Sequence, residues 1–261
     1  LKKSKKKNFF NLDLRSKNLY KYIPKNSIII HLAAISRNSD FDKNPSAAFD
    51  VNIRGTINLV NAASKASASS IIFASSEWVY PEMRNCKFTE NRIYNISNIR
   101  SKYGMSKALG EKLITSLSNV KNNILLRFGI IYGPRDKNFS AVESIFLSVK
   151  TKDKVYVGSF KTGRRFIYID DVVEAIIKSI KIKKNHILNI TGDKVITLKQ
   201  LINESKKILK QDPLVIETNK NKISLTNPPN NKAKLILKWK PKHNIETGLE
   251  KMAEYFKKTY G

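Results

Sequence analysis

The sequence predicts an α/β protein with a parallel sheet, and two observations carry this prediction. Short apolar runs, of the kind that is buried on both faces of a parallel sheet, alternate with longer amphipathic segments. Helix-start and strand-stop signals separate them, among them Asn44-Pro45 and Gly133-Pro134. Strand, helix, strand, helix, strand is the order found in right-handed parallel α/β units.

The first half of the chain predicts most of these elements. Phe9–Leu14 is expected to be a short strand, and Ser16–Tyr22 a short helix that closes before Pro24. Ser27–Ala34 is a continuous apolar run, typical of a strand buried on both faces. The elements expected next are a helix from Pro45 to about Lys65, a strand over Ser70–Ser75, a helix from Arg100 to about Val120 and a strand over Asn123–Ile131.

Beyond Pro134 the alternation is looser, but helix and strand signals continue. Thr197 is the expected N-cap of one helix, because a threonine hydroxyl can accept a hydrogen bond from the first helical turn. The elements predicted here are helices over Ser140–Lys150, Asp170–Ile182, Thr197–Lys210 and Glu246–Tyr260, and strands over Lys154–Val157, Phe166–Ile169 and His186–Ile190.

Composition narrows the class of protein. The 261 residues, 41% of them hydrophobic, suffice for one sizeable domain or for a domain with a smaller appendage. The longest apolar runs, such as Ser27–Ala34 and Ile124–Tyr132, are too short to span a bilayer, so no membrane association is expected. Cys86 is the only cysteine, which excludes an intrachain disulfide and favours a cytoplasmic location.

The formal net charge of +28 suggests a nucleic-acid partner, but its distribution argues against one. Lysines are spread along the whole chain, and they cluster only at Lys2–Lys7 and Lys181–Lys184. No zinc-ligand spacing, helix-turn-helix pattern or aromatic-basic platform accompanies them. We therefore interpret the charge as a composition bias and do not expect nucleic-acid binding.

Tyr103 and Lys107 are four residues apart in a predicted helix, so both side chains leave the same face. A nearby ammonium stabilises a phenolate and lowers the pKa of a tyrosine, which would suit the pair to proton transfer. Tyrosine and lysine are both common here, so a single such spacing is expected by chance. A solvated lysine beside a half-buried tyrosine remains the alternative.

Several short motifs occur in the order and spacing of one known family. They are Asp13-Leu14, His31–Ala34, Asn52 with Gly55-Thr56, Phe73–Tyr80, Tyr103 with Lys107, Leu126-Arg127 leading to Tyr132–Pro134, Arg164–Asp171 and Leu237–Pro241. Over essentially its whole length the chain resembles the extended short-chain dehydrogenase/reductases, and among them the NAD-dependent nucleotide-sugar epimerase/dehydratase family. The resemblance implies NAD as the cofactor, with NADP left open, and a nucleotide-sugar as the substrate.

The resemblance also implies the architecture. The expected fold is a Rossmann-like doubly wound parallel sheet, N-terminally truncated, with a smaller mixed α/β substrate-binding domain. Residues 1–134, joined by 170–190, would form what remains of the dinucleotide-binding domain, and residues 135–169 and 191–261 the smaller domain. By the same resemblance we expect a homodimer that forms through the Tyr103-bearing helix.

The site residues follow from the same motifs. The implied catalytic residues are Ser76, Tyr103 and Lys107, and no metal is expected. The implied cofactor-binding residues are Asp13, Leu14, Leu32, Ala33, Ala34, Ser36, Asn52, Tyr103 and Lys107. The implied substrate-binding residues are Ser36, Glu77 and Arg164, where Arg164 would bind a diphosphate and Arg165 would point to the opposite face of its strand.

Several of these residues could instead have an ordinary structural role. Asp13 could be an ordinary turn aspartate, and Asn52 a capping or core amide. Ala33 and Ala34 could simply pack under a helix. Arg164 could form a structural ion pair with Asp170 or Asp171.

The sequence departs from the family pattern at its start. Relatives begin with a strand and a Gly-x-x-Gly-x-x-Gly turn that holds the cofactor pyrophosphate, and this sequence contains no such turn. Phe9–Leu14 matches the third strand of the family, and the first residue is Leu1 rather than methionine. We therefore expect that the natural chain begins upstream of Leu1 and that the 261-residue chain by itself is inactive.

Two further departures concern the reaction. Dehydratases of the family carry an Asp-Glu pair that protonates the leaving hydroxyl and removes the neighbouring proton. Glu77 and Trp78 occupy those positions here, and tryptophan is neither acid nor base, so we expect NAD-dependent epimerisation. Ile130 replaces an asparagine of many epimerases, which leaves the nucleotide-sugar open. A dehydratase or keto-reductase of the same family, and a binding-only relative, are the alternatives.

Overall fold

The computed structural model describes residues 9–81, 88–91, 95–99, 101–137 and 139–260. The basic run Lys2–Lys7 and the single cysteine, Cys86, lie outside the described residues. Among the helices of the described part, none combines the length and the apolar character needed to cross a bilayer.

The main elements match the predicted order. The strands are β1 Ile28–His31, β2 Ser70–Ser76, β3 Asn122–Phe128, β4 Ile131–Tyr132, β5 Lys154–Val157, β6 Gly163–Arg164, β7 Ile167–Tyr168, β8 His186–Ile190, β9 Ile196–Thr197 and β10 Leu214–Glu217. The α-helices are α1 Asn38–Lys43, α2 Pro45–Phe49, α3 Gly55–Lys65, α4 Lys102–Leu117, α5 Ala141–Thr151, α6 Ile169–Ser179, α7 Leu198–Leu209, α8 Asn231–Leu237 and α9 Ile245–Tyr260. Short 3₁₀ or π turns are η1 Leu19–Tyr22, η2 Asp50–Arg54, η3 Glu77–Val79 and η4 Ile96–Asn98.

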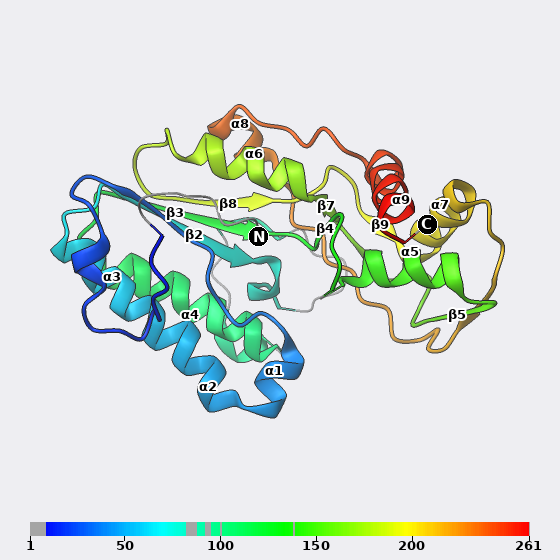
Figure 1. Cartoon of the computed structure of the whole chain (residues 1–261), viewed down its shortest axis with the longest axis horizontal. Coiled ribbons are helices and arrows are strands. Elements are labelled where there is room, and N and C mark those ends of the chain that lie inside the picture. Colours follow the sequence, from blue (N-terminus) through cyan, green and yellow to red (C-terminus); the bar gives the residue numbers. More distant parts are fainter. Residues whose placement is uncertain (1–8, 82–87, 92–94, 100, 138, 261) are drawn as a thin grey trace.

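The main sheet has the order β1-β2-β3-β8, and every neighbouring pair in it is parallel (Figure 1). All seven residues of β2 and all seven of β3 are buried, as expected for central strands covered on both faces. The predicted parallel α/β architecture is thereby confirmed. The carboxyl ends of β1, β2 and β3 meet at one edge of the sheet, which is where ligands bind in open α/β folds.

Alternate residues of the central strands face two different apolar layers. Ile71, Phe73 and Leu125 pack with residues of α3 and α4. Ile72 and Ile124 pack with residues of α6 and α8 on the opposite face. Figure 1 shows these two helix pairs on either side of the strands. The helices cover both faces, so the sheet is doubly wound.

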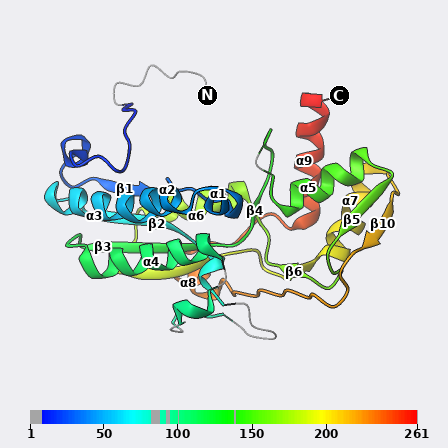
Figure 2. The same cartoon turned by 90° about the horizontal axis from the view of Figure 1, so that it is seen from below.

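A second apolar core lies away from this sheet. It is formed by residues of α5, α7 and α9 with β5, and Phe146 and Phe256 stack within it. Figures 1 and 2 both show these elements gathered at the opposite end of the molecule from α3. β5 pairs with β10 beside these helices in a small parallel sheet. The exact limits of a cofactor domain and a substrate domain stay a prediction.

One predicted strand is wrong, and a second is wrong in part. Phe9–Leu14 is not a strand but irregular chain, because a strand needs a paired neighbour and none of the described strands lies beside it. The run Ser27–Ala34 forms a strand only over β1, and β1 is not buried on both faces. Among the described strands β1 pairs only with β2, at an edge of the sheet, and Ile28 and Ile30 remain more than a third exposed.

Other helix and strand boundaries differ from the predicted ones, because tertiary packing interrupts segments whose sequence pattern is continuous. The expected strand Asn123–Ile131 is split into β3 and β4, with Gly129 between them. A Cβ on Gly129 would lie 2.7 Å from the carbonyl oxygen of Arg165, so the chain leaves the sheet where a neighbouring segment crosses it. The helix from Pro45 to Lys65 is continuous but contains the π turn η2. α1, α8 and β10 were not predicted.

The start of α4 packs against the turn η3 with no space for a side chain at Gly104. A Cβ on Gly104 would lie 2.2 Å from the carbonyl oxygen of Trp78. Gly104→Ala should therefore lower the free energy of unfolding by about 1–3 kcal/mol, although alanine favours a helix, because backbone must move to accommodate the methyl group. Urea unfolding measures this loss.

Gly158→Ala is the matched control. A Cβ on Gly158 meets nothing within 4 Å, so this variant should unfold within about 0.5 kcal/mol of the wild type. Equal stability of the two variants would contradict the close packing at Gly104.

Candidate active site

Ser76, Tyr103 and Lys107 line one cavity at the carboxyl edge of the main sheet. Ser76 is the last residue of β2, and Tyr103 and Lys107 lie on the first two turns of α4. The cavity has a volume of about 520 Å³. The segment after β1, the turn η3, the β3–β4 connection and α6 complete its wall, which includes Leu32, Ala34, Ser36, Trp78, Gly129, Ile130 and Val173. The structure therefore brings the three predicted catalytic residues together.

Local hydrogen bonds determine where α4 begins. Ser101 is the N-cap, and its hydroxyl accepts a hydrogen bond from the Gly104 N–H at 3.2 Å. Ser76 performs the same function for η3, since its Oγ accepts from the Trp78 N–H at 3.3 Å. The caps fix where each turn begins, and the close approach of Gly104 to the Trp78 carbonyl brings the two turns together at one cavity.

Asn52 supports this cavity from behind instead of lining it. Its Oδ1 accepts from the Ile35 N–H at 2.8 Å, and its Nδ2 donates to the Ile35 carbonyl at 2.9 Å and to Ser106 Oγ at 3.0 Å. Ser106 Oγ in turn donates to the Tyr103 carbonyl. Asn52 lies in the π turn η2, a type of helix irregularity often found near functional sites. The amide thus connects the loop after β1 to the Tyr103 turn of α4.

Burial controls the charges at the site. It lowers the pKa of Lys107 to about 8, and the negative charge of Glu111 opposes this shift. Lys107 Nζ lies 4.8 Å from the centre of the Phe73 ring and 5.8 Å from that of the Tyr103 ring. Burial, together with the charge of Lys107, also lowers the pKa of His31 to about 4, so His31 is neutral.

The expected lowering of the Tyr103 pKa is not found. Burial raises the pKa of Tyr103 to about 12, and a hydrogen bond with Ser76 opposes that shift only in part. The physical reason is that loss of water disfavours the phenolate more than its neighbours stabilise it. Tyr103 therefore holds its proton at neutral pH in this structure.

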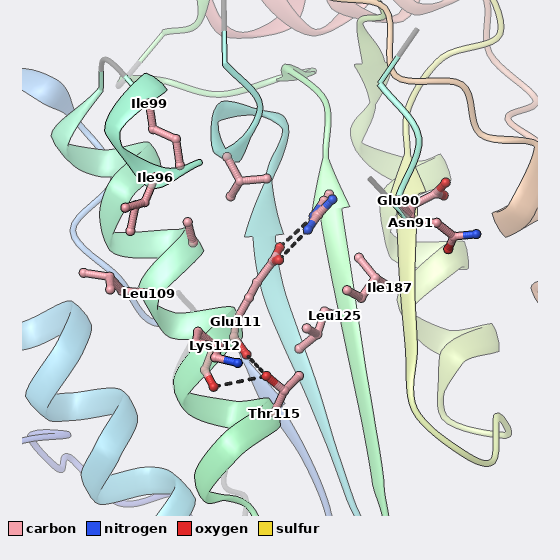
Figure 3. A pocket seen from close by; sticks show the side chains of 13 residues that line it. Glu90, Asn91, Ile96, Ile99, Leu109, Glu111, Lys112, Thr115, Leu125 and Ile187 are labelled. Carbon is pink, nitrogen blue, oxygen red and sulfur yellow. Dashed lines mark hydrogen bonds and ion pairs between the residues drawn. The ribbon is translucent and has the colours of Figure 1, made fainter. Parts of the chain in front are cut away.

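A buried polar network fixes α4 to the sheet behind the cavity. Glu111 accepts from Arg127 Nε at 2.8 Å and Nη2 at 2.6 Å (Figure 3). It also accepts from the Ser75 hydroxyl. Arg127 Nη1 donates to Tyr80 Oη, which donates to Asn189 Oδ1 at 2.6 Å. The network joins α4, β2, β3 and β8, and its Glu111 lies one turn after the predicted catalytic residue Lys107.

A larger cavity, of about 570 Å³, lies on the other side of this network. Figure 3 shows Glu111 at its wall together with Leu109 of α4 and Ile187 of β8. None of the predicted catalytic, cofactor-binding or substrate-binding residues lines it. The smaller cavity is therefore the candidate site.

The predicted cofactor residues separate into two groups. Leu32, Ala34 and Ser36 line the Tyr103 cavity, whereas the adjacent Ala33 is exposed and does not. Asp13 is exposed and forms an ion pair with Arg15, which lowers the pKa of Asp13 to about 2. Leu14 packs over Gly55 at the start of α3. Asp13 and Leu14 therefore lie apart from the cavity.

Glu77 and Arg164 lie in a second, smaller cavity of about 320 Å³. Their charged groups approach to 3.7 Å, and Lys222, Ser224 and Thr226 line the same space. Arg164 donates to Ser224 O and Oγ, whereas Arg165 donates to Asn227 and to the carbonyls of Gly192 and Asp193. The two arginines contact different segments, but Arg165 lies between β6 and β7 and not in a strand, so the strand alternation expected for this pair does not apply. Trp78 lines both cavities.

The sequence analysis assigned no role to three residues that help to form the candidate site or its support. Arg127 stood in a recognised motif without a role, and Glu111 lies four residues after Lys107 on the same helix face. Lys222 lies in a segment rich in lysine and asparagine, where no pattern distinguishes it. The spacing of Lys107 and Glu111 was a usable signal, but Lys222 had none.

Lys107→Met should change the pH dependence of stability. In the folded protein Lys107 loses its proton near pH 8, about 2.5 units below the ordinary value, so a buried charge destabilises the wild type at pH 7. Between about pH 8 and 10.5 the folded state binds fewer protons than the unfolded state, and stability rises with pH. Lys107→Met carries no buried charge, so at pH 7 its free energy of unfolding should exceed that of the wild type by an amount on the order of 3 kcal/mol. This difference should disappear as the pH rises to about 10.5.

Urea unfolding across this pH range measures the difference. Lys112→Met, which removes an exposed lysine from the same helix, is the control and should show no such pH dependence. A constant difference between Lys107→Met and the wild type at every pH would contradict the shift.

Comparisons with known proteins identify a family. The model of the NAD dependent epimerase/dehydratase family matches residues 1–191. A putative UDP-glucose 4-epimerase of Methanocaldococcus jannaschii is 29% identical over 97% of this chain and 85% of its own length. A UDP-glucuronate 4-epimerase of Thermodesulfobacterium geofontis is 27% identical over 98% of this chain and 81% of its own length.

The fold is also found among solved structures. The crystal structure of UDP-glucose 4-epimerase from Thermotoga maritima with UDP-glucose superposes with a TM-score of 0.82. It is 23% identical in sequence, and the match covers 97% of this chain and 85% of that one. The fold is therefore Rossmann-like, as expected. Tyr103, Lys107 and Ser76 of this chain converge at the carboxyl edge of the sheet. Since the family model spans well over half of the chain, this protein belongs to the NAD dependent epimerase/dehydratase family.

Proposed function

We propose that this protein is an NAD-dependent nucleotide-sugar epimerase that acts through a transient keto sugar. The observation that carries the proposal is the convergence of Ser76, Tyr103 and Lys107 on one cavity at the carboxyl edge of a parallel sheet. A hydroxyl, a phenol and an ammonium around one space can bind a sugar hydroxyl, remove its proton and stabilise the resulting charge.

The residues of the chain divide the proton chemistry among them. Tyr103 Oη, once deprotonated, takes the proton of a sugar hydroxyl, and Ser76 Oγ donates a hydrogen bond to the same sugar oxygen. Because the pKa of Tyr103 is about 12, the phenolate needs support, and the charged form of Lys107 supplies it. NAD, when bound, supplies the hydride acceptor and donor. The keto sugar then rotates in the cavity before it is reduced on its other face.

The cavity fits one end of NAD. Tyr103 and Lys107 would bind the nicotinamide ribose, and the small residues Ala34 and Ser36 leave the edge of β1 open to a cofactor. The pyrophosphate end has no equivalent support, because the 261-residue sequence contains no Gly-x-x-Gly-x-x-Gly turn. Asp13, the residue proposed for the adenine side, is paired with Arg15.

Epimerisation is favoured over elimination by the composition of the cavity wall. A dehydratase needs an acid and a base beside the sugar in addition to the tyrosine. The second of those positions holds Trp78, which lines the Tyr103 cavity, and Glu77 lines only the adjacent one. A keto-reductase needs neither group, so it remains the second candidate function.

The adjacent cavity supports a diphosphate substrate. Arg164 and Lys222 contribute positive charge there, and Trp78 forms a wall common to both cavities. A nucleotide-sugar could therefore extend from Tyr103 past Trp78 to Arg164. We retain a homodimer through α4 as part of the proposal; Leu117 at the end of that helix is 46% exposed.

With NAD supplied at about 10 mM, above the dissociation constant expected for the 261-residue chain, Tyr103→Phe should reduce any turnover of UDP-glucose to UDP-galactose by at least about 100-fold, because it removes the proton acceptor and little volume. Affinity for the nucleotide-sugar should stay within about twofold. Proton NMR of the sugar products gives the rate, and calorimetry gives the affinity. Tyr156→Phe, at a tyrosine that is 63% exposed on β5, is the control and should turn over normally. Near-normal turnover by Tyr103→Phe would rule out this proton-transfer role.

Binding of NAD to the 261-residue chain should be weak. Without a glycine turn for the pyrophosphate, we expect a dissociation constant for NAD nearer 1 mM than 1 μM. This corresponds to a binding free energy of about 4–5 kcal/mol in magnitude. Calorimetry with NAD tests this directly. Low-micromolar binding would mean that other residues of the chain hold the pyrophosphate.

A further inference from the structure

Lys107 and Glu111 lie four residues apart on α4, yet their side chains end in different cavities. Lys107 lines the Tyr103 cavity, whereas Glu111 lines the larger cavity of about 570 Å³. Opposite charges at this spacing usually pair, because both side chains leave the same face of the helix. Among the ion pairs of the described residues, none joins these two groups. The helix alone therefore does not explain where the Glu111 carboxylate points.

Arg127 and Ser75 bind that carboxylate from the sheet. Arg127 donates to it from Nε at 2.8 Å and from Nη2 at 2.6 Å, and the Ser75 hydroxyl donates to it from the neighbouring strand. Figure 3 shows the Glu111 carboxylate turned from α4 toward β3. A bidentate arginine pair fixes both carboxylate oxygens, and here both partners are less than a tenth exposed. Glu111 can reach Lys107 only if these bonds break.

The ammonium group of Lys107 is thereby left with aromatic neighbours. Its Nζ lies 4.8 Å from the centre of the Phe73 ring and 5.8 Å from that of the Tyr103 ring, and the residue is only 3% exposed. An ammonium group has three N–H donors, and aromatic faces do not replace the oxygen acceptors that water would provide. Hydroxyl oxygens of a ligand in the Tyr103 cavity would replace them.

The charge of Glu111 still acts on Lys107 from its fixed position. Burial lowers the pKa of Lys107 to about 8, and Glu111 opposes this shift. His31 of β1 also faces Lys107, but burial lowers the pKa of His31 to about 4, so it carries no charge at neutral pH. The residues of α6 that line the cavity are apolar. Glu111 thus supports the ammonium group without covering it.

We infer that Arg127 and Ser75 are positioning residues that hold Glu111 away from Lys107, so that the ammonium group stays open to the hydroxyls of a ligand in the Tyr103 cavity. Without them, a carboxylate one turn away would form an internal ion pair that a ligand would have to break. The consequence for turnover rests on the proposed function, because there Lys107 binds the ribose of NAD. The placement and the titration of Lys107 do not depend on that function.

NMR titration of protein labelled with ¹³C-lysine tests the inference without any ligand, and the signal that is lost in Lys107→Met identifies Lys107. Arg127→Met releases Glu111 to pair with Lys107, so the pKa of Lys107 should rise from about 8 toward the ordinary lysine value of about 10.4. Glu111→Gln removes the supporting charge and leaves the Arg127 cation, so the pKa of Lys107 should fall below about 7. A network that only stabilises the fold would not move this pKa in opposite directions.

Three further variants complete the test. Glu143→Gln is the matched control, because Glu143 of α5 is also fully buried and pairs with an arginine, Arg135, at 2.9 Å. It should leave the pKa of Lys107 at about 8. Arg127→Lys, which keeps a cation beside Glu111, should return the pKa toward the same value. The double variant Glu111→Gln/Arg127→Met has no lone buried charge and should lower the pKa, by less than Glu111→Gln alone.

The response to NAD provides a second readout. At pH 7 the Lys107 signal of the wild type should move on addition of about 10 mM NAD, above the dissociation constant expected for this chain. In Arg127→Met the signal should move by less than about a third as much, because the internal ion pair competes with the ribose. Glu143→Gln should respond as the wild type does.

The outcomes separate this inference from the function it rests on. Arg127→Met should remain folded, because Lys107 then compensates the released carboxylate. Loss of its fold, or a Lys107 pKa that is the same in the wild type, Arg127→Met and Glu111→Gln, overturns the inference while the nucleotide-sugar function stands. The expected titrations without any response of Lys107 to NAD support the positioning of Glu111 and count against the proposed function itself.

Discussion

The ion pair between Glu111 and Arg127 is the interaction on which the site depends. Both side chains are less than a tenth exposed, and two hydrogen bonds join them. Because Glu111 also accepts from Ser75, one carboxylate holds α4 against both central strands. Removal of one member of such a buried pair typically costs about 3–5 kcal/mol, since the other charge is left without compensation. The position of Tyr103 and Lys107 relative to Ser76 therefore depends on groups that do not touch a substrate.

Close packing of α4 makes this arrangement possible. Gly104 lets the helix contact the carbonyl of Trp78, and Gly110 lets it approach the ring of Phe73, where a Cβ would lie 2.8 Å from the nearest ring carbon. Apolar contacts between α3, α4 and the strands supply most of the free energy that holds these layers together. Directional hydrogen bonds at Glu111 and Asn52 then select one position of the helix along the sheet.

The same close packing determines the charges of the site. The pKa of Lys107 is lowered and the pKa of Tyr103 is raised, and burial is the main cause of both shifts. Each side chain is moved toward its neutral form, which a low-dielectric cavity favours. A site of this kind is most stable when it is uncharged, whereas proton transfer needs the charged forms. This opposition between stability and the proposed reactivity follows from the burial of Tyr103 and Lys107.

Local patterns in the sequence determined the order of the main elements, because they depend on residues a few positions apart. The N-caps Asn44, Ser101 and Thr197 accept hydrogen bonds from their own helices, and apolar runs formed β2, β3 and β8. The convergence of Ser76, Tyr103 and Lys107 followed from family motifs together with the rule that parallel strands end at one edge of a sheet.

Only the tertiary structure decided what depends on neighbours distant in sequence. It left Ile28 and Ile30 of β1 partly exposed, because within the described part of the chain that strand pairs on one side only. It gave Tyr103 a pKa of about 12, because desolvation depends on every layer that covers a group. It also placed Trp78 between two cavities and Glu77 beside Arg164, some 90 residues away in the chain, a contact that no local pattern specifies. Spacing along a chain predicts the face a side chain leaves from, but its contacts and its charge are set by the segments that fold against it.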